Sequence, residues 1–141
     1  MATQIFIDGK EGTTGLRIYE RIASRPDLKL LTLSDADRKN PSARKEAIHA
    51  ADIAILCLPD AAARESVALA EGSNTRILDT STAHRVMDGW AYGFPELSAS
   101  HRSMIINGDR IAVPGCHASG FISLTAPLVA AGLLPRNAQL S

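Results

Sequence analysis

Three things are scarce in this sequence: cysteine, an excess of charge of either sign, and long apolar runs. Only two cysteines, Cys57 and Cys116, occur among the 141 residues, in unrelated contexts. Their scarcity argues against a disulfide-rich secreted scaffold and predicts a reducing, cytoplasmic setting. Lysine plus arginine number 15, as do aspartate plus glutamate, so we expect neither nucleic acid nor an anionic membrane as the main partner. No apolar run is long enough to span a bilayer, and the N-terminus lacks the layout of a signal peptide.

What is present is an alternation of strand-like and helix-like segments. Short apolar stretches predict strands over 3–8, 28–33, 52–58 and 76–80. The segments between them predict helices over 13–24, 41–51 and 60–72. This alternation, with short connections, predicts an α/β fold: a Rossmann-like, doubly wound parallel sheet with helices on both faces.

The alternation stops after Thr80. Residues 81–102 show little periodicity, and a loop of that length in a compact domain is often functional. Two short strands, over 103–107 and 110–115, are expected next, followed by a helix over 116–134 with a kink or break at Pro127. The chain ends just after that helix, so we expect it to be part of a larger protein.

A glycine-rich loop follows the first predicted strand. Gly9, Gly12 and Gly15 have the spacing G-x-x-G-x-x-G, and a helix pattern opens inside the loop. Glycine lets the backbone approach a pyrophosphate, and a helix N-terminus offers unpaired N–H groups. The spacing differs from G-x-G-x-x-G, so a glycine-rich turn without a ligand is the alternative. The position after the first strand favours a dinucleotide site.

The end of the second strand is where an adenosine ribose would lie. Asp35 there suits the 2′-hydroxyl of NAD, whereas Ser34, Arg38 and Lys39 suit the 2′-phosphate of NADP. A solvated turn without a ligand is the third alternative, and these residues alone do not decide.

Cys116 stands in "VPGCHASG", between a glycine and the start of a helix pattern. Helix N-termini favour the nucleophilic thiolate form of a cysteine, and their N–H groups can bind an oxyanion. The small residues 118–120 leave room above the sulfur. We therefore predict that Cys116 is a nucleophile, the alternative being an inert small residue at a helix start. Cys57, inside an apolar strand, is expected in the core.

Five motifs resemble N-acetyl-gamma-glutamyl-phosphate reductases of the shorter-chain branch. They are "GKEGTTG", "LCLPDAAARES", "LDTSTAHR", "GWAYGFPEL" and "VPGCHASG". His117 departs from the tyrosine that follows the cysteine in many members, and the members are much longer than this chain. The chain thus resembles the N-terminal portion of such an enzyme.

The resemblance implies an NADP(H)-binding domain over residues 1–115. Residues 116–141 would begin an α+β catalytic and dimerisation domain that is mostly absent here, in an enzyme that forms a homo-oligomer. By this resemblance, the residues expected at the cofactor are Gly9, Gly12, Thr13, Thr14, Gly15, Ser34, Arg38, Leu58 and Pro59. No metal is expected.

The resemblance also implies a reaction. Cys116 would attack N-acetyl-gamma-glutamyl phosphate and release phosphate to leave a thioester, which NADPH reduces to N-acetylglutamate semialdehyde, a step of arginine biosynthesis. Ser81 and Arg85 would anchor the carboxylate or phosphate of the substrate. The general acid/base histidine would lie beyond Ser141, although His84 and His117 are candidates for a role in this chain.

Two other functions compete with this interpretation. An aspartate-semialdehyde dehydrogenase would use the same chemistry, but we would expect an Asn-Cys pair where this chain has Gly115 and Cys116. A non-catalytic nucleotide-binding domain would keep the glycine loop and need no reactive cysteine. In either case we expect the helix after Cys116 to expose an apolar face, made by Phe121, Leu124, Leu128 and Leu133.

Overall fold

A computed structural model describes residues 2–10 and 12–140. Its strands form one six-stranded sheet in the order β2-β1-β3-β4-β6-β5, and every strand pair is parallel. The strands are β1 (Thr3–Asp8), β2 (Leu28–Leu31), β3 (Ile53–Leu56), β4 (Arg76–Asp79), β5 (Ala91–Tyr92) and β6 (Arg110–Ala112). The helices are α1 (Thr13–Ala23), α2 (Pro41–Ala50), α3 (Asp60–Leu69), the 3-10 helix η1 (Pro95–Leu97), α4 (Ala99–Asn107) and α5 (Cys116–Ala130). The predicted Rossmann-like α/β fold is confirmed.

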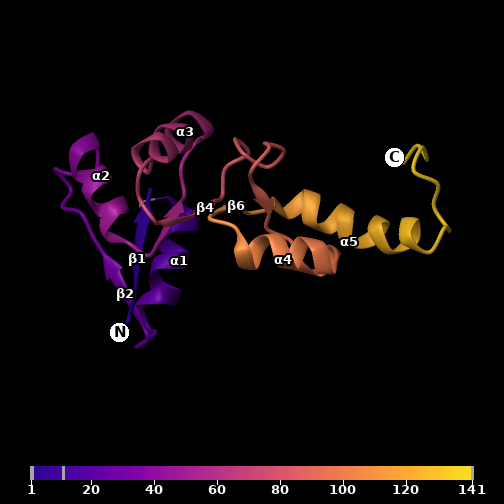
Figure 1. Cartoon of the computed structure of the whole chain (residues 1–141), viewed down its shortest axis with the longest axis horizontal. Helices are drawn as coiled ribbons and strands as arrows, with labels where there is room; N and C mark the ends of the chain where they lie inside the picture. The colour runs from indigo at the N-terminus through magenta and orange to yellow at the C-terminus, as the bar shows by residue number, and fades with distance from the viewer. Residues whose placement is uncertain (1, 11, 141) are drawn as a thin grey trace.

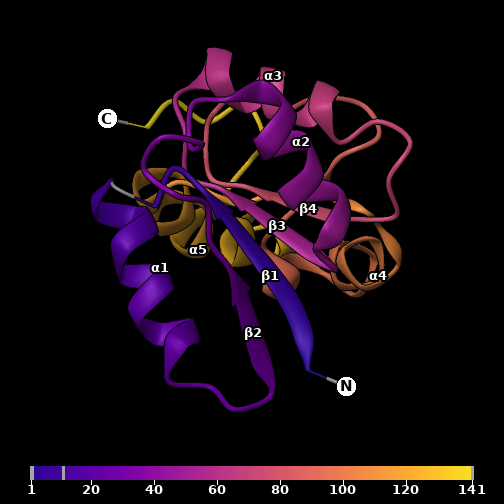
Figure 2. The same cartoon turned by 90° about the vertical axis from the view of Figure 1, so that its left-hand side faces the viewer.

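The sheet has an apolar core on each face because successive strand residues point to opposite sides. Ile5 and Ile7 of β1 pack in one core, which includes Ile18 and Ile22 of α1. Phe6, between them, packs in the other core with Ile48 of α2. Figure 2 shows α1 on one side of the sheet and α2 and α3 on the other. Helices on both faces leave the carboxyl ends of the strands as the open edge where ligands bind in such folds.

The sequence prediction fails between the fourth strand and α5. The strand predicted over 103–107 is wrong: these residues belong to α4, whose N-terminus is capped by Ser98 through a bond from the His101 amide to Oγ at 3.2 Å. Met104 and Ile106 of this helix are exposed, so the apolar run does not mark a buried strand. The strand predicted over 110–115 is β6, which ends at Ala112. Helix α5 continues through Pro127 without a break.

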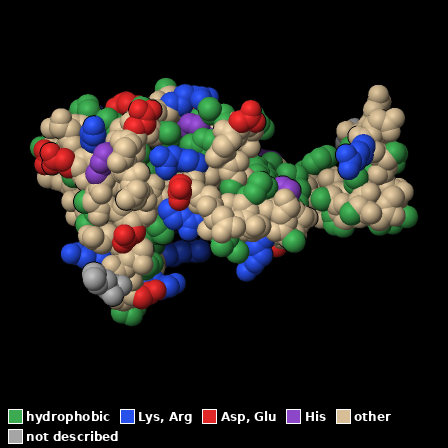
Figure 3. All heavy atoms as spheres, viewed as in Figure 1, with side chains coloured by type: hydrophobic (Ala, Val, Ile, Leu, Met, Phe, Trp, Pro, Cys, Tyr) green, Lys and Arg blue, Asp and Glu red, His purple; other side chains and the backbone are tan. Residues whose placement is uncertain are grey.

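Helix α5 runs away from the sheet, and the C-terminus lies at the far end of the long axis (Figure 1). None of its residues is buried. Phe121, Leu124 and Leu128 of α5 are exposed, as predicted. Leu133 is also exposed but lies beyond the helix, which ends at Ala130 rather than at the predicted residue 134. Figure 3 shows charged side chains over the sheet and few of them towards the end of α5. Within the described residues, no helix has the length and hydropathy to cross a membrane.

Candidate cofactor and cysteine site

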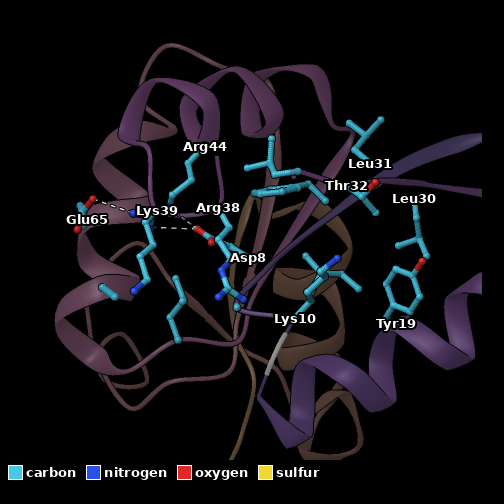
Figure 4. A pocket seen from close by; sticks show the side chains of 16 residues that line it. Asp8, Lys10, Tyr19, Leu30, Leu31, Thr32, Arg38, Lys39, Arg44 and Glu65 are labelled. Atoms are coloured by element: carbon cyan, nitrogen blue, oxygen red, sulfur yellow. Dashed lines mark hydrogen bonds and ion pairs between the residues drawn. The ribbon is translucent and has the colours of Figure 1, made fainter. Parts of the chain in front are cut away.

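A cavity of about 500 Å³ opens beside the carboxyl ends of β1 and β2. That volume lies in the usual range for small-molecule sites, ~300–1,000 Å³. Its walls are mainly apolar, from Phe6, Ile7, Leu30, Leu31 and Leu33, and its rim carries charged side chains from several elements (Figure 4). An apolar slot with a charged rim suits the adenosine end of a dinucleotide.

The cavity brings together some of the predicted cofactor residues. Gly9, Arg38 and Leu58 line it, as does Lys39. Lys10 also lines it, although the glycine spacing gives no reason to single out this residue. Three cationic side chains therefore reach the cavity from two loops, those after β1 and β2.

Other predicted residues lie outside the cavity lining. Ser34 is exposed, and its hydroxyl donates to Asp37 Oδ2 at 2.6 Å within the turn after β2. Asp35, which would favour NAD, is exposed and 4.0 Å from Arg38 Nη1. Pro59 is the N-cap of α3. Thr13 and Thr14 are exposed at the start of α1 and stay predictions as cofactor residues.

The three loop glycines differ in how closely the rest of the chain surrounds them. Gly9 has φ +86°, and a Cβ there would collide with the carbonyl of Cys57. A Cβ on Gly15 would collide with the carbonyl of Gly9 and lie 2.7 Å from Lys10 Cα. A Cβ on Gly12 would meet only the Gly9 carbonyl, at an ordinary 3.7 Å. Packing within the chain explains Gly9 and Gly15 but not Gly12, the exposed N-cap of α1, where a pyrophosphate would approach.

Alanine at Gly12 is therefore expected to separate binding from folding. Gly12→Ala should leave the unfolding midpoint nearly unchanged and weaken dinucleotide binding about tenfold or more, ~1.4 kcal/mol, because the new methyl group would occupy space needed by phosphate. Calorimetric titration with NADPH and a urea unfolding curve give the two values. Gly120→Ala is the control away from the loop, because a Cβ there meets nothing within 4 Å and the backbone φ is not positive. Equal affinity of Gly12→Ala and the unchanged chain would contradict the pyrophosphate site.

A buried ion pair forms the floor of the cavity. Asp8, at the end of β1, accepts bonds at Oδ2 from Arg44 Nη2 at 3.0 Å and Nε at 3.2 Å, and from Ser66 Oγ at 2.7 Å. Arg44 also donates to Glu65 Oε1 at 2.8 Å. Asp8 and Arg44 are almost inaccessible to solvent, and the cluster ties β1 to α2 and α3. Sequence reasoning missed it, because Arg44 stands in a helix that reads as polar and exposed.

Cys116 lies at another part of the same sheet edge. It is exposed, opens α5 and follows Gly115, which as N-cap has no side chain to bond the first-turn amides. Arg85 donates from Nε to Val113 O at 3.1 Å and from Nη2 to Thr80 O at 3.1 Å. A Cβ on Gly115 would lie 2.8 Å from Arg85 Nη1. The missing side chain thus lets a guanidinium lie against the residue that precedes the thiol.

A second buried polar cluster holds the loop that carries Arg85. Asp79, at the end of β4, accepts at Oδ2 from Ser81 Oγ and from His84 Nδ1, both at 2.6 Å. Asp79, Ser81 and His84 are all buried. The His84 ring stacks on Trp90, with ring centroids 4.1 Å apart and planes 11° apart. The hydroxyl of Ser81 therefore points to Asp79, and its predicted contact with substrate stays a prediction.

The two cysteines have different surroundings. Cys57 lies just after the end of β3 and is half-buried against the α1 core, so the prediction of a core position within the strand is only partly right. Burial raises the pKa of its thiol. Cys116 is exposed, and its Sγ lies 3.7 Å from His117 Nδ1. Although these residues are successive in the helix, their side chains turn towards each other at the exposed start of α5. Among the described residues, no group of three or more potential ligands is arranged to hold a metal ion.

Comparison with known families supports a dinucleotide-binding role. The family described as "Semialdehyde dehydrogenase, NAD binding domain" matches residues 4–105. Among solved structures, aspartate semialdehyde dehydrogenase from Francisella tularensis has a TM-score of 0.69 at 15% identity, over 92% of this chain and 41% of that chain. The enzyme from Candida albicans, in a structure with NADP, has a TM-score of 0.67 at 13% identity, over 95% and 48%. At these identities the likeness shows the fold alone.

Sequence relatives are much closer. The chain is 53% identical over 137 residues to an N-acetyl-gamma-glutamyl-phosphate reductase from Burkholderia lata, which covers 97% of this chain and 44% of the relative. It is 56% identical over 135 residues to the protein of that name from Chelativorans sp., in a match that covers 96% of this chain and 44% of that relative. The chain spans less than half the length of these relatives, and the resemblance drawn from its motifs is confirmed. This chain belongs to the family of semialdehyde dehydrogenase NAD-binding domains, whose cofactor is a nicotinamide dinucleotide.

Proposed function

We propose that this chain supplies the cofactor site and the nucleophile of an N-acetyl-gamma-glutamyl-phosphate reductase. The enzyme would reduce N-acetyl-gamma-glutamyl phosphate to N-acetylglutamate semialdehyde with release of phosphate, in arginine biosynthesis. The observation that carries the proposal is the exposed Cys116 at the start of α5, with the Arg85 guanidinium against Gly115. The names of relatives above 50% identity support the choice of substrate.

The chemistry follows from the position of the thiol. The sulfur of Cys116 attacks the carbonyl carbon of the acyl phosphate, the bond from that carbon to the phosphate oxygen breaks, and phosphate leaves with the electron pair. The product is a thioester on Cys116. First-turn N–H groups of α5 have no acceptor within the helix, so they are available to the developing oxyanion. Arg85 offers a planar cation to the phosphate or carboxylate. NADPH, when bound, supplies the hydride that reduces the thioester.

The proposal predicts stoichiometric acylation. Mixing residues 1–141 with N-acetyl-gamma-glutamyl phosphate should release one phosphate per chain and add one acyl group, seen in the intact mass and removed by hydroxylamine. Steady-state reduction is not expected from this stretch, because the resemblance places the acid/base histidine, a group that contributes ~10²–10⁴-fold, beyond Ser141. A chain that binds NADPH but forms no adduct would favour a non-catalytic nucleotide-binding domain. An adduct with aspartyl phosphate instead would favour the aspartate-semialdehyde enzyme.

We also propose NADP(H) rather than NAD(H) as the cofactor. Arg38 and Lys39 line the cavity, whereas Asp35 lies outside the lining and pairs with Arg38. NADPH should bind more tightly than NADH in calorimetric titration. Arg38→Gln should reduce that preference about 10- to 100-fold, as expected for a charge-assisted bond of ~1.5–3 kcal/mol. Arg21→Gln, on α1, is the control, and tighter binding of NADH by the unchanged chain would refute the assignment.

The remaining assignments are proposals on the same grounds. Residues 1–115 would form the cofactor domain, and α5 would begin the catalytic domain, in a homo-oligomer of the longer enzyme. A cytoplasmic location fits two cysteines that form no disulfide. Partners are the small-molecule substrate and phosphate, with neither nucleic acid nor membrane involved.

A further inference from the structure

The buried cluster around Asp79 and His84 has no role so far, either in the cofactor site or in the chemistry of Cys116. Ordering a buried carboxylate and imidazole is costly unless every polar atom is paired. Here Asp79 Oδ2 is shared by Ser81 and His84, and Asp79 Oδ1 accepts from the Ser81 amide at 3.0 Å. Ser81 Oγ in turn accepts from the Ala83 amide at 3.1 Å. The bonds converge on one carboxylate and fix the backbone from 79 to 84.

Arg85 follows this fixed segment directly. Its guanidinium bonds to Thr80 O, at the start of the loop, and to Val113 O, on the segment that leads to Cys116. The Val113 amide donates to Asp79 O at 2.8 Å, so the same residue of β4 anchors both segments. The bond between His84 and Asp79 joins the two ends of the 79–84 segment. The direction of the Arg85 side chain therefore depends on this bond. Trp90, which packs against the α2 core, fixes the imidazole from the other side.

We propose that His84 is a positioning residue: its bond to Asp79 and its stacking on Trp90 hold the 80–85 loop so that Arg85 presents its guanidinium to an anion beside Cys116. The inference rests on the proposed function of Arg85 and Cys116. It assigns His84 a task other than direct contact with substrate, since its Nδ1 is committed to Asp79 and its ring is buried.

The test measures how strongly the Cys116 site favours an anion. Iodoacetate and iodoacetamide alkylate a thiol by the same reaction, but only iodoacetate carries a negative charge. The rate of alkylation of Cys116 by iodoacetate divided by its rate with iodoacetamide is therefore raised by a nearby cation. The chain with Cys57→Ser leaves one thiol, and intact mass gives both rates. Arg85→Gln should lower the ratio about fivefold, which corresponds to the ~1 kcal/mol between unit charges at 4 Å in water. Raising the salt concentration should shrink the difference.

Substitutions at His84 separate positioning from folding. His84→Phe keeps a ring for Trp90 and removes the donor to Asp79, so it should lower the ratio in the same direction by at least half of the Arg85→Gln change on a logarithmic scale. His84→Asn places an amide N–H near the position of Nδ1 but has no ring to stack on Trp90, so it should restore only part of the ratio that His84→Phe loses. If His84 only stabilised the fold, its substitution would change the alkylation rates with both reagents by the same factor, and their ratio would stay constant. Circular dichroism confirms that each variant is folded.

The outcomes are distinguishable. If Arg85→Gln leaves the ratio unchanged, Arg85 is not the anion anchor, and that part of the proposed function fails. If Arg85→Gln lowers it and His84→Phe does not, the positioning role of His84 is overturned and the proposed function stands. Should His84→Phe fail to fold, Trp90→Leu removes the stacking partner from outside the loop. This variant keeps the bond to Asp79, so a partial fall similar to that of His84→Asn is then expected, and an unchanged ratio would overturn the proposal.

Discussion

Cys116→Ser is expected to abolish the phosphate burst and the covalent adduct formed with N-acetyl-gamma-glutamyl phosphate. A serine hydroxyl has the same position and nearly the same size, but it ionises far less readily than a thiol and is a far weaker nucleophile than a thiolate. NADPH affinity should stay within a factor of about two, because the cavity lining does not include Cys116. Rapid-quench phosphate release, intact mass and calorimetry give the three measurements.

Cys57→Ser is the matched control. Burial raises the pKa of that thiol, which packs half-buried against the sheet core, so the variant should keep the full burst with a small loss of stability. An adduct that persists in Cys116→Ser and disappears in Cys57→Ser would show that Cys57, not Cys116, is the nucleophile. A burst that survives both changes would exclude a thioester.

Arg44→Met is expected to lower the free energy of unfolding by ~3–5 kcal/mol, the usual cost of leaving a buried charge without its partner. The side chain of Arg44 is 8% exposed and that of Asp8 is 6% exposed, so water cannot replace the lost bonds. Domain stabilities are only ~5–15 kcal/mol, and the variant should be partly unfolded near its working temperature. Urea unfolding followed by circular dichroism measures the change.

A surface ion pair provides the comparison. Arg25 bonds to Asp27 and holds the pKa of that carboxyl at about 2, but both side chains are more than half exposed. Arg25→Met should barely move the urea midpoint while the pKa of Asp27 rises towards its usual range. The double variant Asp8→Leu with Arg44→Met should be more stable than Arg44→Met alone, since it removes the orphaned charge. Equal losses for Arg25→Met and Arg44→Met would contradict the role of burial.

The fold was predictable where local pattern and tertiary packing agree. The first four strands and the three helices between them follow from apolar runs and helical spacing, because each faces a core on the sheet. The prediction of a strand over 103–107 was wrong for the opposite reason. Met104 and Ile106 face solvent, so their spacing does not mark a buried face of a strand or a helix. Strand β5 has only two residues, too few for any pattern.

The candidate site was predictable only in part, and the reason is physical. The loop glycines could be recognised from the sequence because the absence of a Cβ allows backbone conformations and close contacts that other residues cannot adopt. The Arg44 and His84 clusters depend on partners 36 and 5 residues away in the chain, brought together by the ends of β1 and β4. A polar residue on a predicted helix or loop looks the same whether it is solvated or buried, so composition and spacing could not single out either side chain.

The lack of any buried residue in α5 affects how its amides exchange with solvent deuterium. Amides in β1 and β3, which lie in the middle of the sheet, exchange only through global unfolding, whereas a helix without buried side chains opens by local fraying. Because Cys116 belongs to the first turn of α5, each opening event also removes the amide groups that surround the thiol. Any surface that covers Phe121, Leu124 and Leu128 slows this opening, so protection of the helix and reactivity of the cysteine should rise together.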